Sequence, residues 1–295
     1  MHQSISPHNS RGLISTVLRL SLAFGTLVLL SPLYQALGQP PASPSPPKVL
    51  RIFREEVKPG KVAAHEKIEV GWPQAFAKAN YPVHYVAMTS MAGPNEAWFL
   101  EGNDSFASIE KAEQVVEKNA TLKAELEKLS ERDGELLSVG RTILATYRED
   151  LSYRPNVTLS QMRYMTVTTT RVRPGHDSEF VALRKIVNAA HEKANMDEHW
   201  AMYQVVSGAP AGTYLLFLPI KSMAQMDGAQ EIHGKPFQDA LGEENQKKVR
   251  ELSSSAIMTS ESTLFAFSPK MSYPSKEFAT GDPDFWMPKP HKTKK

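Results

Sequence analysis

The stretch Val57-Lys-Pro-Gly60 recurs 115 residues later as Val172-Arg-Pro-Gly175. At the same offset, Lys78-Ala-Asn80 followed by His84 recurs as Lys193-Ala-Asn195 followed by His199. Further matches drift from this offset by a few residues, as expected where surface loops accept insertions. These segments are not of low complexity, so the run of matches indicates an internal duplication of one structural unit.

Each copy has the same predicted order of elements, β-α-β-β-α-β. Apolar residues at spacings of three and four predict an amphipathic helix over 61–78, with a kink or short break at Pro73. Period-two patterns and turn residues predict the strands of both copies. The predicted strands are 49–54, 83–91, 97–100 and 141–147 in copy one, and 163–171, 200–206, 213–218 and 263–267 in copy two.

A split βαβ unit of about 110 residues is the ferredoxin-like motif, whose sheet has helices on one face only. The other face is apolar and must be covered. We therefore predict an α+β fold in which two tandem ferredoxin-like repeats pack their sheets face to face as an α/β barrel. The sequence leaves open whether the two copies close within one chain or between the chains of a homodimer.

A resemblance to a known group of proteins is carried by Arg51–Arg54, Val57–Gly60, Trp72, Trp98–Leu100 and Ser105–Lys111, and in copy two by Val172–Gly175 and Ser222–Met226. The pattern resembles the dimeric α/β-barrel superfamily, and most of all its NipSnap-like and antibiotic-biosynthesis-monooxygenase-like branches. That resemblance implies a barrel fold. It does not imply one activity, because the superfamily includes cofactor-free monooxygenases, isomerases, haem enzymes and proteins without known activity.

The N-terminal 38 residues have the pattern of a secretory signal peptide. Arg11 and Arg19 are their only charged side chains, an 11-residue apolar run follows, and Ala36-Leu-Gly38 offers small residues for cleavage. The apolar run is shorter than the roughly 20 residues that span a bilayer, although retention as an N-terminal anchor is the alternative. We predict export to the periplasm or the extracellular space, with no stable membrane span after cleavage.

The remaining boundaries follow from composition. We predict a Pro/Ser-rich linker at 39–48, repeat one at 49–155, repeat two at 156–268 and a mobile basic tail at 269–295. The 295 residues include 34 Lys and Arg, 32 Asp and Glu, and no Cys. Loss of the leader removes two arginines and leaves the charges balanced, so no nucleic-acid partner is predicted. The lack of Cys excludes disulfides, thiolate zinc sites and iron–sulfur clusters.

His84 and His199 occupy equivalent positions at the start of the second strand of each copy. If their side chains point into the barrel, residues of like parity join them, and we predict that His84, His199, Tyr203 and Met88 bind a small apolar or aromatic molecule. The competing interpretation is that duplication preserved a structural histidine, which hydrogen-bonds a nearby loop or helix end.

No metal site and no cofactor are predicted. His191, Asp197, Glu198 and His199 cluster in the sequence without a recognised ligand spacing, and His176, His191 and His233 would be the formal candidates for a haem ligand. We leave open whether the protein is an enzyme. The alternative function is a non-catalytic envelope protein that acts through protein contacts. Its barrel would be packed, with the interior filled by Met88, Met202, Phe99 and Leu215.

Overall fold

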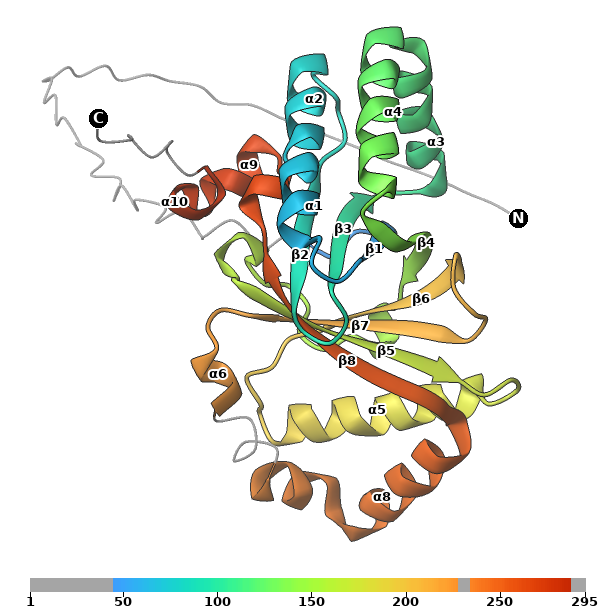
Figure 1. Cartoon of the computed structure of the whole chain (residues 1–295). Helices are drawn as coiled ribbons and strands as arrows, with labels where there is room; N and C mark the ends of the chain where they lie inside the picture. Colours follow the sequence, from blue (N-terminus) through green and yellow to red (C-terminus); the bar gives the residue numbers. More distant parts are fainter. Residues whose placement is uncertain (1–44, 228–233, 288–295) are drawn as a thin grey trace, which may run out of the picture. The chain divides into compact units, whose positions relative to one another are not determined.

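The computed structural model describes residues 45–227 and 234–287, all of which lie within one compact unit, Ala42–Lys295. The predicted signal peptide and most of the predicted linker lie outside the described residues. Eight strands form a closed antiparallel barrel in the order β1-β3-β2-β8-β5-β7-β6-β4 (Figure 1). The strands are β1 (Val49–Val57), β2 (Tyr85–Ala92), β3 (Glu96–Asn103), β4 (Leu137–Tyr147), β5 (Tyr164–Val172), β6 (Ala201–Ser207), β7 (Thr213–Ile220) and β8 (Ile257–Phe267).

Two strand pairs join the halves of the barrel. β2 pairs with β8, where Met88 lies opposite Phe267, and β4 pairs with β6, where Tyr147 lies opposite Tyr203. Both halves have the same internal order, β4-β1-β3-β2 and β8-β5-β7-β6. The barrel therefore closes within one chain, and closure does not require a second copy.

Helices cover the outer face of each half, on opposite sides of the barrel (Figure 1). None of the helices within 45–227 and 234–287 combines the length and the apolar character of a membrane-spanning segment. The helices on the first half are α1 (Val62–Glu69), α2 (Gly71–Ala79), α3 (Phe106–Lys118) and α4 (Ala120–Gly134). The helices that follow in the chain are α5 (Asp177–Lys193), the short α6 (Ala224–Asp227) and α8 (Lys235–Ala256).

The helix predicted over 61–78 is two helices, with a break at Val70. The break places Pro73 in the first turn of α2, where its missing N–H costs no helical hydrogen bond. Asn80 ends α2 in the left-handed conformation with φ of 50°, as predicted for a helix C-terminus. Asn195 has the same conformation with φ of 49° at the 115-residue offset.

Side chains fill the middle of the barrel. The inward positions hold large apolar residues of all eight strands, among them Ile52, Met88, Trp98, Leu215 and Phe265. Eight strands enclose a space just wide enough for such packing or for one small ligand. Met202 and Phe99, in contrast, belong to separate clusters outside the barrel, because they occupy the opposite parity on β6 and β3. Their expected place in the barrel interior was therefore wrong.

The C-terminal segment packs on the protein, so the prediction of a mobile tail was wrong for 269–287. A single helical turn at Pro269–Met271 is followed by α9 (Lys276–Thr280) and α10 (Pro283–Trp286). Trp286 is 4% exposed within the barrel's core cluster, and its Nε1 donates to the Ser160 carbonyl at 2.7 Å. The prolines of this segment suggested a tail, but the burial of its aromatic side chains stabilises its packing on the barrel. The basic end, 288–295, lies outside the described residues.

We expect Trp286→Ala to lower the free energy of unfolding by about 3–5 kcal/mol, because it removes a buried aromatic and leaves a cavity. Urea unfolding of the full chain measures this difference. Met287→Ala is the matched control, since Met287 is 48% exposed, and its effect should stay within about 0.5 kcal/mol. Equal small effects for both variants would mean that the segment does not contribute to the core.

Candidate functional site

A cavity of about 340 Å³ lies at one end of the barrel. Most of its lining is apolar, and it is bounded by three kinds of segment: the ends of barrel strands, the N-terminal Pro46-Pro47 and the C-terminal helix α9. The cavity is lined by Ser45, Pro46, Pro47, Leu50, His84, Tyr85, Val86, Leu100, Gly102, Pro155, Val157, Leu159, Met165, His199, Trp200, Ala201, Tyr203, Phe217, Pro219, Pro274, Ser275 and Phe278. Its size and composition are typical of a site for a small organic molecule.

The structure brings three of the four predicted residues to this cavity. His84 directly precedes β2, His199 lies two residues before β6, and Tyr203 is within β6. The strand alternation that places Val86 and Tyr203 inward also directs the two histidines toward the barrel end. Met88 lies two residues beyond Val86 on β2. It is fully buried and packs in the barrel core without lining the cavity.

His84 has an unsatisfied polar atom. Its Nδ1 is buried and has no hydrogen-bond partner within the described residues. One face of the ring contacts Tyr273, with 4.7 Å between ring centroids. A buried nitrogen without a partner costs on the order of 1–3 kcal/mol.

His199 is anchored by both ring nitrogens. Nδ1 lies 2.7 Å from the carbonyl oxygen of Arg154, and Nε2 lies 3.2 Å from Oδ1 of Asp197. Arg154 has a φ of 40°, the left-handed region that a residue with a Cβ seldom adopts. His199 therefore holds a strained turn in place, which is the structural role considered above for this pair of histidines.

Tyr203 is bound to the N-terminal segment. Its hydroxyl donates to the carbonyl oxygen of Pro47 at 2.9 Å, and its ring packs against Phe217. Burial raises the pKa of Tyr203 well above the ordinary tyrosine value, with a further contribution from Tyr147. The phenol therefore stays neutral at physiological pH and fixes the Pro-rich segment over the cavity.

Sequence analysis missed the two segments that cover the cavity. Pro47 approaches β3 closely because Gly102 has no side chain: a Cβ there would lie 2.9 Å from the proline ring. On the other side, Phe278 lies in the C-terminal segment that was predicted to be mobile. The aromatic residues at 278–286 were the sequence signal that this segment is buried, since clusters of Phe and Trp are rarely left exposed to solvent.

The sequence cluster around His191 is divided into pairs within the described residues. His191 Nε2 lies 2.9 Å from Oε2 of Glu198, whereas His199 contacts Asp197, so the side chains form two separate pairs. His176 lies 3.1 Å from Glu179 on the surface of α5, and His233 lies outside the described residues. One other group in the described part of the chain has the composition of a metal site, and it includes Glu55, Glu69 and Asp133, none of which was predicted as a site residue.

Comparison with known proteins supports the fold. No family model matches the chain, and no curated protein sequence matches it. An anthrone oxidase-like protein of known structure superposes with a TM-score of 0.51 at 12% identity, over 80% of this chain and 97% of its own. This chain and that protein therefore share one fold.

Two further structures superpose less closely. A protein provisionally described as a monooxygenase from Fusobacterium nucleatum gives a TM-score of 0.48 at 13% identity, over 76% of this chain and 94% of its own. A chlorite dismutase variant from Candidatus Nitrospira defluvii gives 0.46 at 10% identity, over 80% and 96%. At these scores and identities, neither structure carries an activity over to this chain.

We expect His199→Ala to lower the free energy of unfolding by about 1–3 kcal/mol, because the Arg154 carbonyl loses its donor in a strained turn. Chemical denaturation measures the loss. His176→Ala is the matched control, since it removes a surface imidazole from the start of α5. A His199→Ala protein as stable as the control would contradict the anchoring role.

Proposed function

We propose that this chain is an exported α/β-barrel protein that binds a small apolar or aromatic molecule in the cavity at the barrel end. The observation that carries the proposal is a mostly apolar cavity of about 340 Å³ with the imidazole of His84 in its wall. Such a site would take a flat molecule with one polar group. His84 would meet that group, and residues such as Val86, Leu100 and Phe217 would contact the apolar part.

The proposal includes a tandem duplication and a place in the NipSnap-like or antibiotic-biosynthesis-monooxygenase-like branch. Support comes from the 115-residue offset, at which Asn80 and Asn195 share a left-handed conformation, as do Gly60 and Gly175. The identical strand order of the two halves also supports a tandem duplication. Export rests on the pattern of residues 1–38 alone.

The alternative is a non-catalytic envelope protein that acts through protein contacts. The tightly filled middle of the barrel favours it, since Trp98 and Phe265 pack with their ring centroids 5.4 Å apart and leave the cavity confined to one end. Under this alternative, the cavity would be a packing defect below the N-terminal segment and would bind neither a polar nor an apolar aromatic probe.

The first test uses 2-naphthol and naphthalene as probes in fluorescence titrations of the full chain. His84→Ala should weaken 2-naphthol binding about 5- to 10-fold, because one hydrogen bond contributes on the order of 1 kcal/mol. It should leave the affinity for naphthalene within about twofold, and His176→Ala should change neither. Equal losses for the two probes would contradict a polar role for His84. Failure of the wild-type protein to bind either probe would favour the alternative function.

The second test fills the cavity. Ala201 lies at the start of β6 and lines the cavity, so Ala201→Trp should place an indole where the ligand would lie. We expect this variant to lose binding of both probes at least 10-fold and to keep its cooperative unfolding transition. A variant that folds and binds 2-naphthol as tightly as the wild type would exclude this cavity as the binding site.

A further inference from the structure

A buried acidic cluster lies outside the barrel, between β1 and the helices of the first half. Four side chains each bring one potential ligand atom within 4.8 Å of the other three. His65 and Glu69 are one helical turn apart on α1, so they share a face of that helix. The cluster consists of Glu55 on β1, His65 and Glu69 on α1, and Asp133 near the end of α4.

Three carboxylates meet in this cluster with little to balance their charge. His65, Glu69 and Asp133 are each at most 3% exposed. Nε2 of His65 lies 2.9 Å from Oε2 of Glu55 and 3.5 Å from Oδ1 of Asp133. Within the described residues, no Lys or Arg forms an ion pair with any of the three carboxyl groups. His65 is the basic side chain that faces them, and the indole N–H of Trp72 also approaches Glu69.

Two oxygens of the cluster have no hydrogen-bond partner. They are Oε1 of Glu69 and Oδ1 of Asp133, and both are buried. Oδ1 of Asp133 is directed at the imidazole of His65, 3.5 Å away. Buried carboxylate oxygens are normally satisfied, because leaving them without a donor or a cation is costly. A proton or a bound cation would satisfy these oxygens.

The same region of the second half shows that the fold does not need such a cluster. At the 115-residue offset, His65 corresponds to Phe180 and Glu69 corresponds to Arg184. Phe180 packs on Tyr214 with 4.6 Å between ring centroids, in an ordinary apolar core. In the first half, burial and mutual repulsion of the carboxylates raise the pKa of Glu69 to about 10. An apolar core would avoid this electrostatic cost.

We propose that the buried acidic cluster binds one divalent transition-metal ion of the Mn²⁺ and Fe²⁺ class. One imidazole nitrogen with carboxylate oxygens and no thiolate is a donor set that suits these ions. Ligands on opposite sides of an octahedral ion with bonds of about 2.1 Å lie about 4.2 Å apart. The 4.8 Å limit of the cluster is close to that span, so small side-chain movements bring all four donors into contact with one ion.

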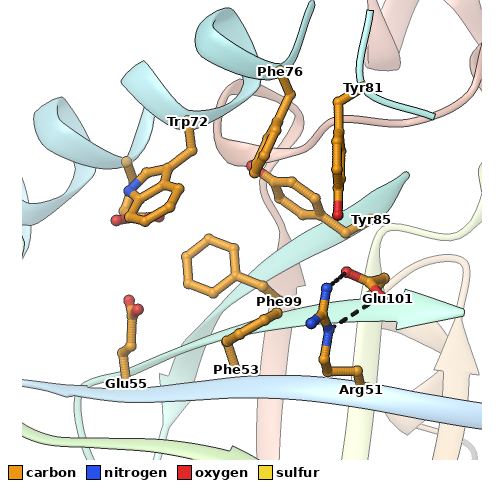
Figure 2. A pocket seen from close by; sticks show the side chains of 10 residues that line it. Arg51, Phe53, Glu55, Trp72, Phe76, Tyr81, Tyr85, Phe99 and Glu101 are labelled. Carbon is orange, nitrogen blue, oxygen red and sulfur yellow. Dashed lines mark hydrogen bonds and ion pairs between the residues drawn. The ribbon is translucent and has the colours of Figure 1, made fainter. Parts of the chain in front are cut away.

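The cluster borders an aromatic chamber of about 120 Å³, shown in Figure 2. Glu55 and Glu69 lie in one wall of the chamber, and Arg51 lies at the other side, held by Glu101 through bonds of 3.1 and 2.7 Å. Trp72, Phe76, Tyr81, Tyr85, Phe53 and Phe99 form the rest. A chamber beside the cluster leaves room for water or a small molecule to complete the coordination, as at metal sites that are open on one side.

The test is Mn²⁺ binding to the metal-free full chain, followed by electron paramagnetic resonance and isothermal titration calorimetry. We expect one Mn²⁺ per chain. Glu69→Gln and Asp133→Asn, which keep side-chain shape, should each weaken binding at least 10-fold, since even the outer partners of metal ligands change affinity by that order. Glu66→Gln is the matched control, because Glu66 is on the same helix and pairs with Lys270 outside the cluster.

Thermal unfolding gives a second measurement that does not depend on the choice of titration. At one fixed Mn²⁺ concentration, the melting temperature of the wild type and of Glu66→Gln should rise, and that of Glu69→Gln should rise less, because a ligand stabilises the folded form in proportion to how tightly it binds. Absence of stoichiometric Mn²⁺ binding in the wild type would overturn the proposal. So would a folded Glu69→Gln protein that binds Mn²⁺ as tightly as the wild type. The naphthol titrations address the other cavity, so either proposal can fail alone.

Discussion

The pairing of β2 with β8 and of β4 with β6 is the constraint on which the rest of the structure depends. Each half presents a four-stranded sheet with one apolar face and two open edges. Joining the edges removes unpaired backbone groups that would otherwise invite aggregation. It also turns the two apolar faces toward each other, which buries Ile52, Met88, Trp98 and Phe265 in one core. In a chain without cysteine, that burial has to stabilise the fold without disulfides.

Closure also decides where binding sites can form. The middle of an eight-stranded barrel is filled by its own side chains, so space remains only at the ends and beneath the outer helices. At one end, Pro47 and Phe278 cover an apolar cavity that contains His84. Beneath the helices of the first half, polar residues replace the apolar packing seen around Phe180 in the second half. The two candidate sites thus lie on opposite sides of the same sheet, and Tyr85 lines both.

The repeat offset and the strand parity predicted much of this arrangement. They were sufficient for the succession of strands and helices along the chain, for the left-handed Asn80 and for the location of His84, His199 and Tyr203 at one cavity. They could not distinguish His84 from His199, because the difference lies in the carbonyl of Arg154 and in Asp197, which loops bring to His199 alone. Whether any of these residues binds a ligand stays a prediction.

Other features were beyond the reach of local patterns. His65 lies within the helix predicted over 61–78. Its partners Glu55 and Asp133 come from β1 and α4, which only the folded chain brings together. The segment 269–287 was predicted to be mobile from its prolines, yet Trp286 packs in the barrel core. In each case the deciding interaction joins residues that are far apart in the sequence, and no periodicity records such a contact.

One chain closes a barrel whose middle is packed and whose apolar cavity lies at one end, beside His84. Crystallography of the full chain under xenon pressure tests this directly, because xenon enters dry apolar cavities large enough to hold it. We expect xenon between His84, Tyr203 and Phe278 and none in the middle of the barrel. A barrel formed with strands of a second chain, or xenon at its centre and none at its end, would contradict it.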